Sequence, residues 1–458
     1  MIHSVIQKSQ LEGADRLDAE YFQPEYLDLM QEINRVDHQS LKALGCKVVS
    51  GPFGSSLKSE AYLDKGVPFL RINDLKDFFI DKDNLIYISE EDNNRLKQSQ
   101  LLPYDLVLSK VGNTIGIVSV IPEDFNVSNI SENNIGIKFD KSVTSQHKLY
   151  ILTFLNSELG LQQVLRSISG NAQPKLNVHD VERIIFPVPS RSVLDSNFIL
   201  INNARQYIAQ AQAYYGQAEE LLLGELGLKD FHFEDDLSFV VNFSDVQNAD
   251  RIDAEYFQPK YQKLISKIKD QNAKVLSDLV SIKKGFEPGS EAYQEEGKLF
   301  IRVSSLSKFG IDSSDQKYLS DDLFNQLRVD YQPQIGEVLL TKDATPGIAY
   351  VLKESIGGVI SGGILRMKTK NGIEPEYLAL CINSIVGKWQ AERDAGGSVI
   401  AHWKPDRIRN ILIPVLPREK QDEIAELVRK SHEARKKSKE LLEEAKSKVE
   451  EMIEKEGN

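Results

Sequence analysis

The residue types used in enzymatic chemistry are present in this chain, but not at the spacings that catalytic sites require. There is no GxxxxGK[ST] phosphate loop, no GxGxxG string after a strand, no GxSxG turn and no NPPY or DPPY string. Two cysteines, Cys46 and Cys381, exclude a disulfide framework and a cysteine-based zinc site. The seven histidines show neither HxxxH nor HExxH spacing. The sequence therefore predicts a chain that has no catalytic activity and no metal of its own.

A thirteen-residue string that occurs twice organises the rest of the chain. Residues 14–26 read ADRLDAEYFQPEY and residues 249–261 read ADRIDAEYFQPKY, with eleven identical positions. We call each string a copy of the repeated segment. The copies lie about half a chain length apart in 458 residues. This spacing predicts two similar domains in tandem rather than a solenoid.

Each copy is followed by a short amphipathic helix and then by β-type alternation. Pro24 or Pro259 stands where the helix could begin, because its fixed φ suits the first helical position. Longer helices are expected at residues 148–167 and 375–393. Matching strings recur downstream, at residues 59–62 and 290–293 and at residues 105–121 and 337–352. Short strands joined by glycine loops indicate an α+β fold with a mainly antiparallel, curved sheet.

Each half ends in a long helix after a proline-marked exit. In the second helix, apolar and small residues from Ile424 to Met452 recur every 3.5 residues on average, which is typical of a coiled coil. Neither apolar stripe can stay exposed, so we expect the two helices to pair antiparallel. Two globular domains would then lie at opposite ends of the pair, related by a pseudo-twofold axis. The predicted boundaries are a first domain at 1–190, its helix at 191–226, a linker at 227–236, a second domain at 237–417 and its helix at 418–458.

Composition places the protein in a broad class. Hydrophobic content of 41% and charged content of 27% are ordinary for a globular protein. No apolar run is long enough to cross a bilayer and the N-terminus is not a signal peptide, so a cytoplasmic location without membrane contact is expected. The net charge of −12 counts mildly against nucleic-acid binding. A basic cleft can still lie on an acidic body.

Several strings together resemble the specificity subunit of type I restriction–modification systems. GPFGSSL at 51–57 and GVPFLRINDL at 66–75 are similar to the opening strands of that family's target recognition domains. DLVLSKVGNTIG at 105–116 and GNAQPKLNVHDVERIIFPVP at 170–189 look like its later strand and its exit to the helix. In the second half, GSVIAHWKPDRI at 397–408 replaces the expected Gln-Pro string. Leu194 also stands where the second helix has Gln421.

The resemblance implies a non-catalytic subunit that reads a bipartite, asymmetric target in double-stranded DNA. It implies two adenine methyltransferase subunits and motor-nuclease subunits as partners, with AdoMet, ATP and magnesium bound by those partners and no cofactor in this chain. Two alternatives stay open. The chain could be the DNA reader of another phage-defence or modification system, or a coiled-coil scaffold, which the net charge of −12 favours slightly.

The candidate DNA contacts are cations and amides on glycine-rich loops, because such side chains can reach phosphates or base edges. In the first domain they are Lys58, Arg71, Lys110, Asn113, Thr114, Gln173 and Lys175. In the second domain they are Lys283, Lys284, Arg302, Lys342, His402, Trp403 and Lys404. The alternative is that these are solvated or structural side chains. Arg71 and Arg302, at the same place in both halves, also suit a structural salt bridge.

The repeated segment is expected to meet a partner or to form a structural joint, because two domains that read different DNA need not share a base-reading string. Its carboxylates would also repel phosphates. The candidate partner contacts are Asp18, Glu20, Tyr21, Phe22, Asp253, Glu255, Tyr256 and Phe257. The four aromatic residues would be the anchors, since aromatic side chains dominate interface energetics.

Overall fold

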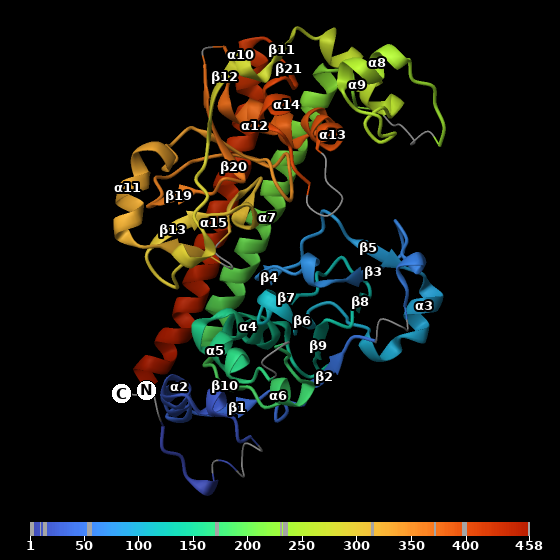
Figure 1. Ribbon diagram of the computed structural model, residues 1–458. Helices are drawn as coiled ribbons and strands as arrows, with labels where there is room; N and C mark the ends of the chain where they lie inside the picture. Colours follow the sequence, from blue (N-terminus) through green and yellow to red (C-terminus); the bar gives the residue numbers. More distant parts are fainter. Residues whose placement is uncertain are drawn as a thin grey trace. The chain divides into compact units, whose positions relative to one another are not determined.

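The computed structural model describes residues 4–9, 11, 16–52, 57–169, 174–229, 231, 237–312, 316–370, 372–395 and 401–456 (Figure 1). The chain divides into two compact units. Unit 1 comprises residues 1–208 and 436–458, and unit 2 comprises residues 209–435. Each half of the duplicated sequence thus supplies most of one unit. The expected pseudo-twofold relation and the exact domain boundaries stay predictions.

Unit 1 contains a five-stranded sheet that is antiparallel except at one edge. Its strand order is β2 (Lys47–Ser50), β9 (Asn134–Lys138), β6 (Leu106–Ser109), β7 (Val118–Val120) and β4 (Phe78–Phe79). A three-stranded sheet has the order β5 (Ile86–Ile88), β3 (Val67–Leu70) and β8 (Asn129–Ile130), and β1 (His38–Ser40) pairs with β10 (Ile185–Pro187). The pairs β4–β7 and β3–β8 are parallel.

Helices complete unit 1. They are α2 (Pro24–Asn34), α3 (Glu90–Arg95), α4 (Ser145–Asn156), α5 (Glu158–Arg166) and α6 (Val178–Glu182), with 3-10 turns η1 (Ala19–Phe22), η3 (Ser59–Ala61), η4 (Ile72–Asp74), η5 (Lys97–Ser99) and η6 (Gly112–Thr114). Unit 1's share of the two long helices, described below, closes its main core.

Unit 2 repeats most of this topology, with four strands in its main sheet where unit 1 has five. Its main sheet has the order β12 (Val280–Lys284), β20 (Ile364–Thr369), β17 (Val338–Thr341) and β18 (Ala349–Val351). The smaller sheet has the order β16 (Lys317–Leu319), β13 (Lys298–Ile301) and β19 (Gly358–Ile360). Two further pairs are β11 (Ala273–Val275) with β21 (Leu412–Pro414) and β14 (Leu306–Ser307) with β15 (Gly310–Ile311). The matching strand orders confirm the predicted α+β class and the mainly antiparallel sheets.

Most helices of unit 2 also follow the chain order of the five helices of unit 1. They are α8 (Phe243–Ala249), α9 (Pro259–Lys269), α10 (Leu276–Leu279), α11 (Asp321–Tyr331), α12 (Pro375–Asn383), α13 (Ile385–Asp394) and α14 (Pro405–Arg409), with turns η7 (Ser290–Ala292) and η8 (Val303–Ser305). Helices α2 and α9 begin at the prolines that predicted their starts. No helix among the described residues combines the length and the apolar composition needed to cross a membrane.

The single helices expected at 148–167 and 375–393 are wrong, because each is two helices broken at a serine. Ser157 ends α4 and caps α5, and Ser384 does the same between α12 and α13. A glycine follows each break at a close backbone approach. A Cβ at Gly160 would lie 2.0 Å from the carbonyl oxygen of Phe154, and one at Gly387 would lie 2.2 Å from that of Ile382. These tight turns return α5 and α13 over the preceding helix.

In each unit two buried side chains hold the strand that precedes the long helix, β10 in unit 1 and β21 in unit 2, which we call the exit strand. The amide group of Gln163 bonds both the N–H and the C=O of Ile185, at 3.0 and 2.9 Å. Gln390 bonds Leu412 in the same two-sided way, at 2.9 and 2.8 Å. The hydroxyl groups of Tyr150 and Tyr377 donate to Pro187 and Pro414 on the same strands. The backbone of each exit strand is therefore satisfied by buried groups, which fixes its position.

The two long helices are α7 (Arg191–Glu225) and α15 (Arg418–Glu456), and each contributes to both units. Within unit 1, the Ser438 hydroxyl donates to the Ala204 carbonyl at 2.9 Å, and Lys448 donates to Ser196. Within unit 2, the Ser431 hydroxyl donates to the Ala211 carbonyl at 2.7 Å, and Lys420 pairs with Glu225. In each unit, the residue numbers of the contacting pairs rise along one helix as they fall along the other. The predicted antiparallel pairing is confirmed in each.

The helix contact gives a direct test of the fold. Ile201 is 0% exposed in the core of unit 1, whereas Ile199 on the same helix is 57% exposed. Ile201→Ala should lower the free energy of unfolding by about 2–5 kcal/mol, because it removes buried methyl groups and leaves a cavity. The matched variant Ile199→Ala should change it by less than about 0.5 kcal/mol. Urea denaturation of the full chain measures both. Equal effects would contradict the burial of this helix face.

Candidate nucleic-acid interface and the repeated segment

Two loops of unit 1 that carry candidate contacts lie side by side. We call residues 110–116, after β6, the strand loop, and residues 167–176, after α5, the exit loop, of which 170–173 lie outside the described part of the chain. The Lys110 carbonyl accepts the Leu176 N–H at 3.0 Å, and Val111 pairs with Lys175 in an antiparallel bridge. The Lys110 ammonium donates to the Ser50 hydroxyl at 2.7 Å. Burial lowers the pKa of Lys110 below its usual range.

Unit 2 builds the same pair of loops. Here the strand loop is residues 342–347 and the exit loop is residues 395–403, of which 396–400 lie outside the described part of the chain. The Lys342 carbonyl accepts the Trp403 N–H at 2.8 Å, and Asp343 pairs with His402 in an antiparallel bridge. Residues 401–403, the described start of the string that replaces the expected Gln-Pro motif, thus occupy the place that residues 174–176 have in unit 1.

The side chains on this shared backbone differ between the units. In unit 2 the Asp343 carboxylate binds the Lys342 ammonium and lies 2.9 Å from His402 Nδ1. Burial alone would raise the pKa of Asp343, but the hydrogen bonds from Lys342 and His402 hold it below its ordinary value. The corresponding positions in unit 1 are Val111 and Lys175. One backbone frame therefore presents an ionic cluster in unit 2 and separate cations in unit 1.

The other predicted contacts divide by exposure. The exposed ones are Lys58, Asn113, Lys175, Lys283, Lys284, His402 and Lys404. The partly buried ones are Arg71, Lys110, Thr114 and Arg302. Lys342 is 9% exposed, and Gln173 lies outside the described residues. These side chains stay candidates for DNA contact.

Trp403 requires a correction. Its side chain is 1% exposed and packs in the main core of unit 2. It takes the place that Leu176 occupies in unit 1, where Leu176 is also buried. An indole in this position contributes to the loop's anchorage, and we remove it from the expected direct contacts.

Arg71 acts within the protein. Its guanidinium pairs with the buried Asp74 carboxylate at 3.0 Å and donates to the Asn84 carbonyl at 2.7 Å. In unit 2, Ser305 takes the place of Asp74 and accepts the Arg302 N–H at 3.1 Å. Arg71 also lines a cavity of about 380 Å³ together with Asn73 and Asn133. The salt bridge anticipated for this position is present in unit 1.

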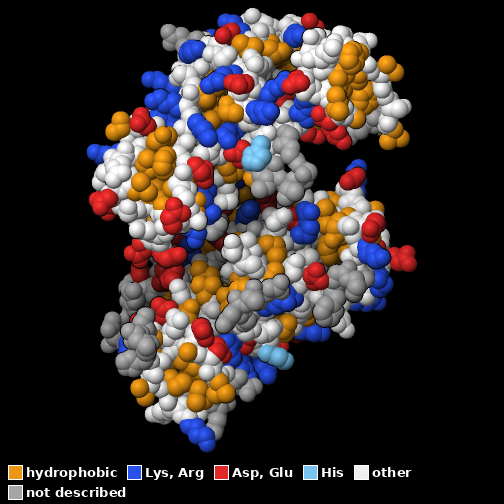
Figure 2. Space-filling model, viewed as in Figure 1, with side chains coloured by type: hydrophobic (Ala, Val, Ile, Leu, Met, Phe, Trp, Pro, Cys, Tyr) orange, Lys and Arg blue, Asp and Glu red, His pale blue; other side chains and the backbone are white. Residues whose placement is uncertain are grey.

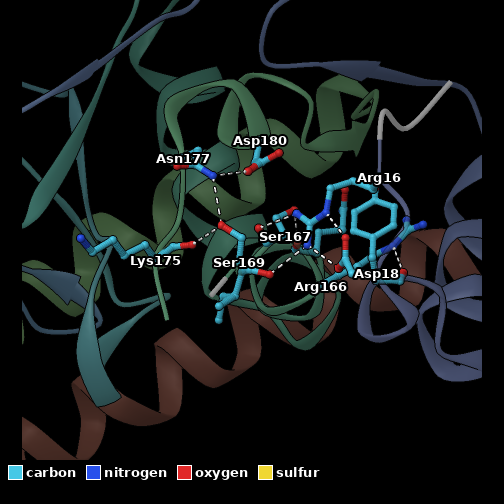
Figure 3. Close-up of polar contacts among 11 residues, drawn as sticks. Arg16, Asp18, Arg166, Ser167, Ser169, Lys175, Asn177 and Asp180 are labelled. Carbon is cyan, nitrogen blue, oxygen red and sulfur yellow. Dashed lines mark hydrogen bonds and ion pairs between the residues drawn. The ribbon is translucent and has the colours of Figure 1, made fainter. Parts of the chain in front are cut away.

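The first copy of the repeated segment binds the end of α5 through hydrogen bonds and a cation–π contact (Figure 3). The Arg16 guanidinium makes two 2.6 Å hydrogen bonds to the Asp18 carboxylate. It also donates to the carbonyls of Ser167 at 3.2 Å and Ile168 at 3.1 Å. Arg166 donates to the Tyr21 carbonyl at 2.9 Å, and its guanidinium lies 3.9 Å from the centre of the Tyr21 ring.

The second copy makes equivalent contacts at the end of α13. The Arg251 guanidinium makes a two-pronged pair with Asp253 and donates to the Asp394 carbonyl at 3.4 Å. Arg251 and Arg393 lie 4.8 and 5.2 Å from the centre of the Tyr256 ring. We call this arrangement of arginine, aspartate and tyrosine the clasp. Sequence reasoning missed Arg166 and Arg393, although both stand three residues after the buried glutamine of their unit.

The repeated segment has an inner and an outer side. Phe22 and Phe257 are 4% and 7% exposed. With Tyr21 and Tyr256 held in the clasps, the aromatic residues serve the fold of each unit. The side chains of Glu20 and Glu255 are exposed, and Leu17 and Ile252 are 85% and 89% exposed. The outer side is therefore acidic and aliphatic at matching positions in both copies.

Charge is distributed unevenly over the surface. Lys and Arg side chains gather where Figure 1 places β12 and α14 of unit 2, as Figure 2 shows. Those two elements contribute Lys283, Lys284, Arg407 and Arg409. A net charge of −12 thus coexists with local cation density of the kind that phosphate contacts require. The described residues form no group of three or more His, Cys, Asp or Glu side chains that could hold a metal ion.

Comparison with known proteins gives one partial sequence match. No family model matches the chain. The type I restriction enzyme EcoBI specificity subunit of Escherichia coli is 26% identical over 157 residues, which are 34% of this chain and 32% of that protein. The match thus spans about a third of the relative's length.

Solved structures of similar chains align over most of the sequence. The S subunit of a type I restriction–modification system from M. genitalium covers 92% of this chain and 96% of its own, with 11% identity and a TM-score of 0.40. The HsdS subunit from Thermoanaerobacter tengcongensis covers 89% and 96%, with 13% identity and a TM-score of 0.27.

The clasp predicts a pH-dependent contribution to stability. Hydrogen bonds from Arg16 hold the pKa of Asp18 below its ordinary value of 3.8. The stabilisation is therefore present above about pH 3.8 and is lost as the pH falls through the lower pKa of the folded state. Asp18→Asn should cost about 1 kcal/mol at pH 7, a value reduced for the partial exposure of the pair. Urea denaturation should show that the difference in free energy of unfolding between the variant and wild type becomes smaller as the pH falls from 7 to 3.

The exposed Asp28 on α2 supplies the control, and Asp28→Asn should match wild type at every pH. A cost of Asp18→Asn that does not change with pH would contradict the ionic account of the clasp.

Proposed function

We propose that this chain is the DNA-recognition subunit of a type I restriction–modification complex and reads a bipartite, asymmetric target. The observation that carries the proposal is the pair of loops that both units build on one backbone frame with different side chains. The partial similarity to the EcoBI specificity subunit supports the same assignment.

The shared frame explains how two half-sites could be read by one chain. In both units a strand-loop carbonyl accepts an N–H from the exit loop, at 3.0 Å in unit 1 and 2.8 Å in unit 2. Side chains on such a frame would meet similar places on DNA. Val111 and Lys175 differ chemically from Asp343 and His402, so they would select different base edges. Two unlike readers in one chain require an asymmetric target.

In this proposal the chain positions other subunits and performs no chemistry itself. Two adenine methyltransferase subunits and the motor-nuclease subunits would associate with it, and AdoMet, ATP and magnesium would bind to those partners. The duplicated outer side of the repeated segment supports a partner that is present twice, because it offers the same aliphatic and acidic side chains in each unit.

The DNA-reading proposal is tested by the methylome of a host that carries the chain with its partner subunits. The modified sequence should have two unlike parts separated by unread bases, roughly one helical turn from centre to centre. The double variant Asp343→Ala and His402→Ala should relax or lose one part only, since both residues lie on the loops of unit 2. A continuous site, a palindrome or an unmodified genome would overturn the proposal.

The partner proposal is tested with the outer side of the repeated segment. Leu17→Asp places a charge on an 85% exposed position of unit 1, and Ile252→Asp does so at the matching position of unit 2. Each should remove one methyltransferase subunit and leave the other, with the melting temperature of the isolated chain unchanged. Light scattering gives the mass of the complex.

Replacing Tyr21 and Phe22 with alanine provides the contrast. These residues lie in the clasp and the core, so this variant should lower the melting temperature. Full stoichiometry in both Asp variants would contradict a partner surface on the outer side.

A further inference from the structure

We infer that Arg16 and Arg251 are positioning residues, which set the exit loops and through them the strand loops that carry the candidate DNA contacts. The inference rests on the proposed function. It assigns to the inner side of the repeated segment, which is identical in the two copies, a role in recognition that requires no contact with DNA.

First, Arg16 holds the chain where α5 ends. A carbonyl just past the end of a helix has no partner in the helix and needs a donor from elsewhere. Arg16 donates to the carbonyls of Ser167 and Ile168, directly after α5 ends at Arg166. Asp18 fixes the guanidinium by accepting two of its hydrogen bonds. A planar, two-pronged pair of this kind restricts orientation as well as distance.

The second step leads from the helix end to the candidate contacts. Ser169, the next residue, exchanges two backbone hydrogen bonds with Lys175, at 3.0 and 2.9 Å. Lys175 pairs with Val111, and the Leu176 N–H donates to the Lys110 carbonyl. A continuous path of hydrogen-bonded backbone therefore runs from Arg16 to Lys110. Figure 3 shows the contacts of Arg16 at the start of this path and the Ser169 hydroxyl facing the Lys175 carbonyl.

The third step is the repetition of the device in unit 2. Arg251 donates to the Asp394 carbonyl at the end of α13, and Asp253 fixes its guanidinium. Beyond the undescribed residues 396–400, the Ala401 carbonyl accepts the Ala344 N–H at 2.9 Å. The exit loop thus again joins the strand loop. In addition, Arg407 donates to the Ala249 carbonyl, which holds the start of the second copy.

The positions that are identical in the two units lie at the start of this path, and the positions that differ lie at its end. Arg16, Asp18 and Tyr21 are identical to Arg251, Asp253 and Tyr256, whereas the loop side chains that the path reaches differ. The exit strand is already fixed by Gln163 and Gln390, so the clasp is not needed to hold it. Its carbonyl contacts fall on the root of the exit loop. Both units need the exit loop in a fixed position, although the two units would read different bases.

The test uses the complex of this chain with its methyltransferase subunits. The probes are duplexes with the two-part target read from the host methylome, and versions with one part or the other scrambled. Arg16→Gln removes the guanidinium and its charge while keeping a side chain of similar length. It should reduce discrimination of one part roughly tenfold, which is the scale of a lost base contact, and leave the other part unchanged. Arg251→Gln should reduce discrimination of the other part and leave the first unchanged.

Arg35→Gln is the control, since Arg35 is an exposed arginine of unit 1 directly after α2. The inference is overturned if Arg16→Gln matches this control, or if both parts weaken equally. Failure of the wild-type complex to distinguish any sequence would instead refute the proposed function.

A loss caused by local unfolding is separated by a second pair of variants. Arg16→Lys keeps a cation that can donate to the carbonyls of residues 167 and 168, and it should recover part of the discrimination. Asp18→Asn keeps Arg16 but loosens its orientation, and it should reduce discrimination of the same part by less than Arg16→Gln. The positioning role is wrong if Arg16→Lys recovers no discrimination, or if Asp18→Asn reduces discrimination as much as Arg16→Gln does.

Discussion

The burial of one face of α7 against one face of α15 is the constraint on which each unit depends. In unit 1 the contact includes Ala204 and Ser438, and in unit 2 it includes Ala211 and Ser431. Small residues let the helices approach, and each of these two serine hydroxyls donates to a carbonyl of the other helix, so neither hydroxyl is buried without a hydrogen bond. The cores of both units extend onto these helices, which fixes the sheets and hence the loops that leave them.

The elements that local sequence specifies were predictable. Pro24 and Pro259 start their helices because a fixed φ is a property of the residue itself, and the apolar repeat of α15 follows from its own period. The breaks at Ser157 and Ser384 were not, because they depend on backbone that packs against Gly160 and Gly387. Trp403 illustrates the same limit for the site. Its place in a polar string suggested a contact, but the core of unit 2 buries it.

The candidate site was predictable as a set of loops and not as an arrangement. Nothing in the spacing of Arg16 and Arg166 indicates that both would contact Tyr21. The salt bridge at Arg71 could be anticipated because a partner stands three residues along the chain. Partners far apart in sequence become evident only when the turn after α4 has brought α5 back to the repeated segment. The sequence therefore identified the segment as important and could not divide its residues between fold and surface.

That division explains why the two copies remain so similar. The clasp accounts for the identity of Arg16, Asp18 and Tyr21 with their counterparts, since each has a contact that only a similar residue could make. It does not account for Glu20 and Glu255, whose side chains are exposed in both units. Leu17 and Ile252 stand at the same position of the two copies and differ only in how the aliphatic side chain branches. Both side chains are almost fully exposed. An exposed position that stays aliphatic beside an exposed position that stays acidic is the pattern of a surface that meets the same partner twice. The segment thus joins two tasks in one string, because the residues that would bind the partner alternate with the residues that hold the exit loop.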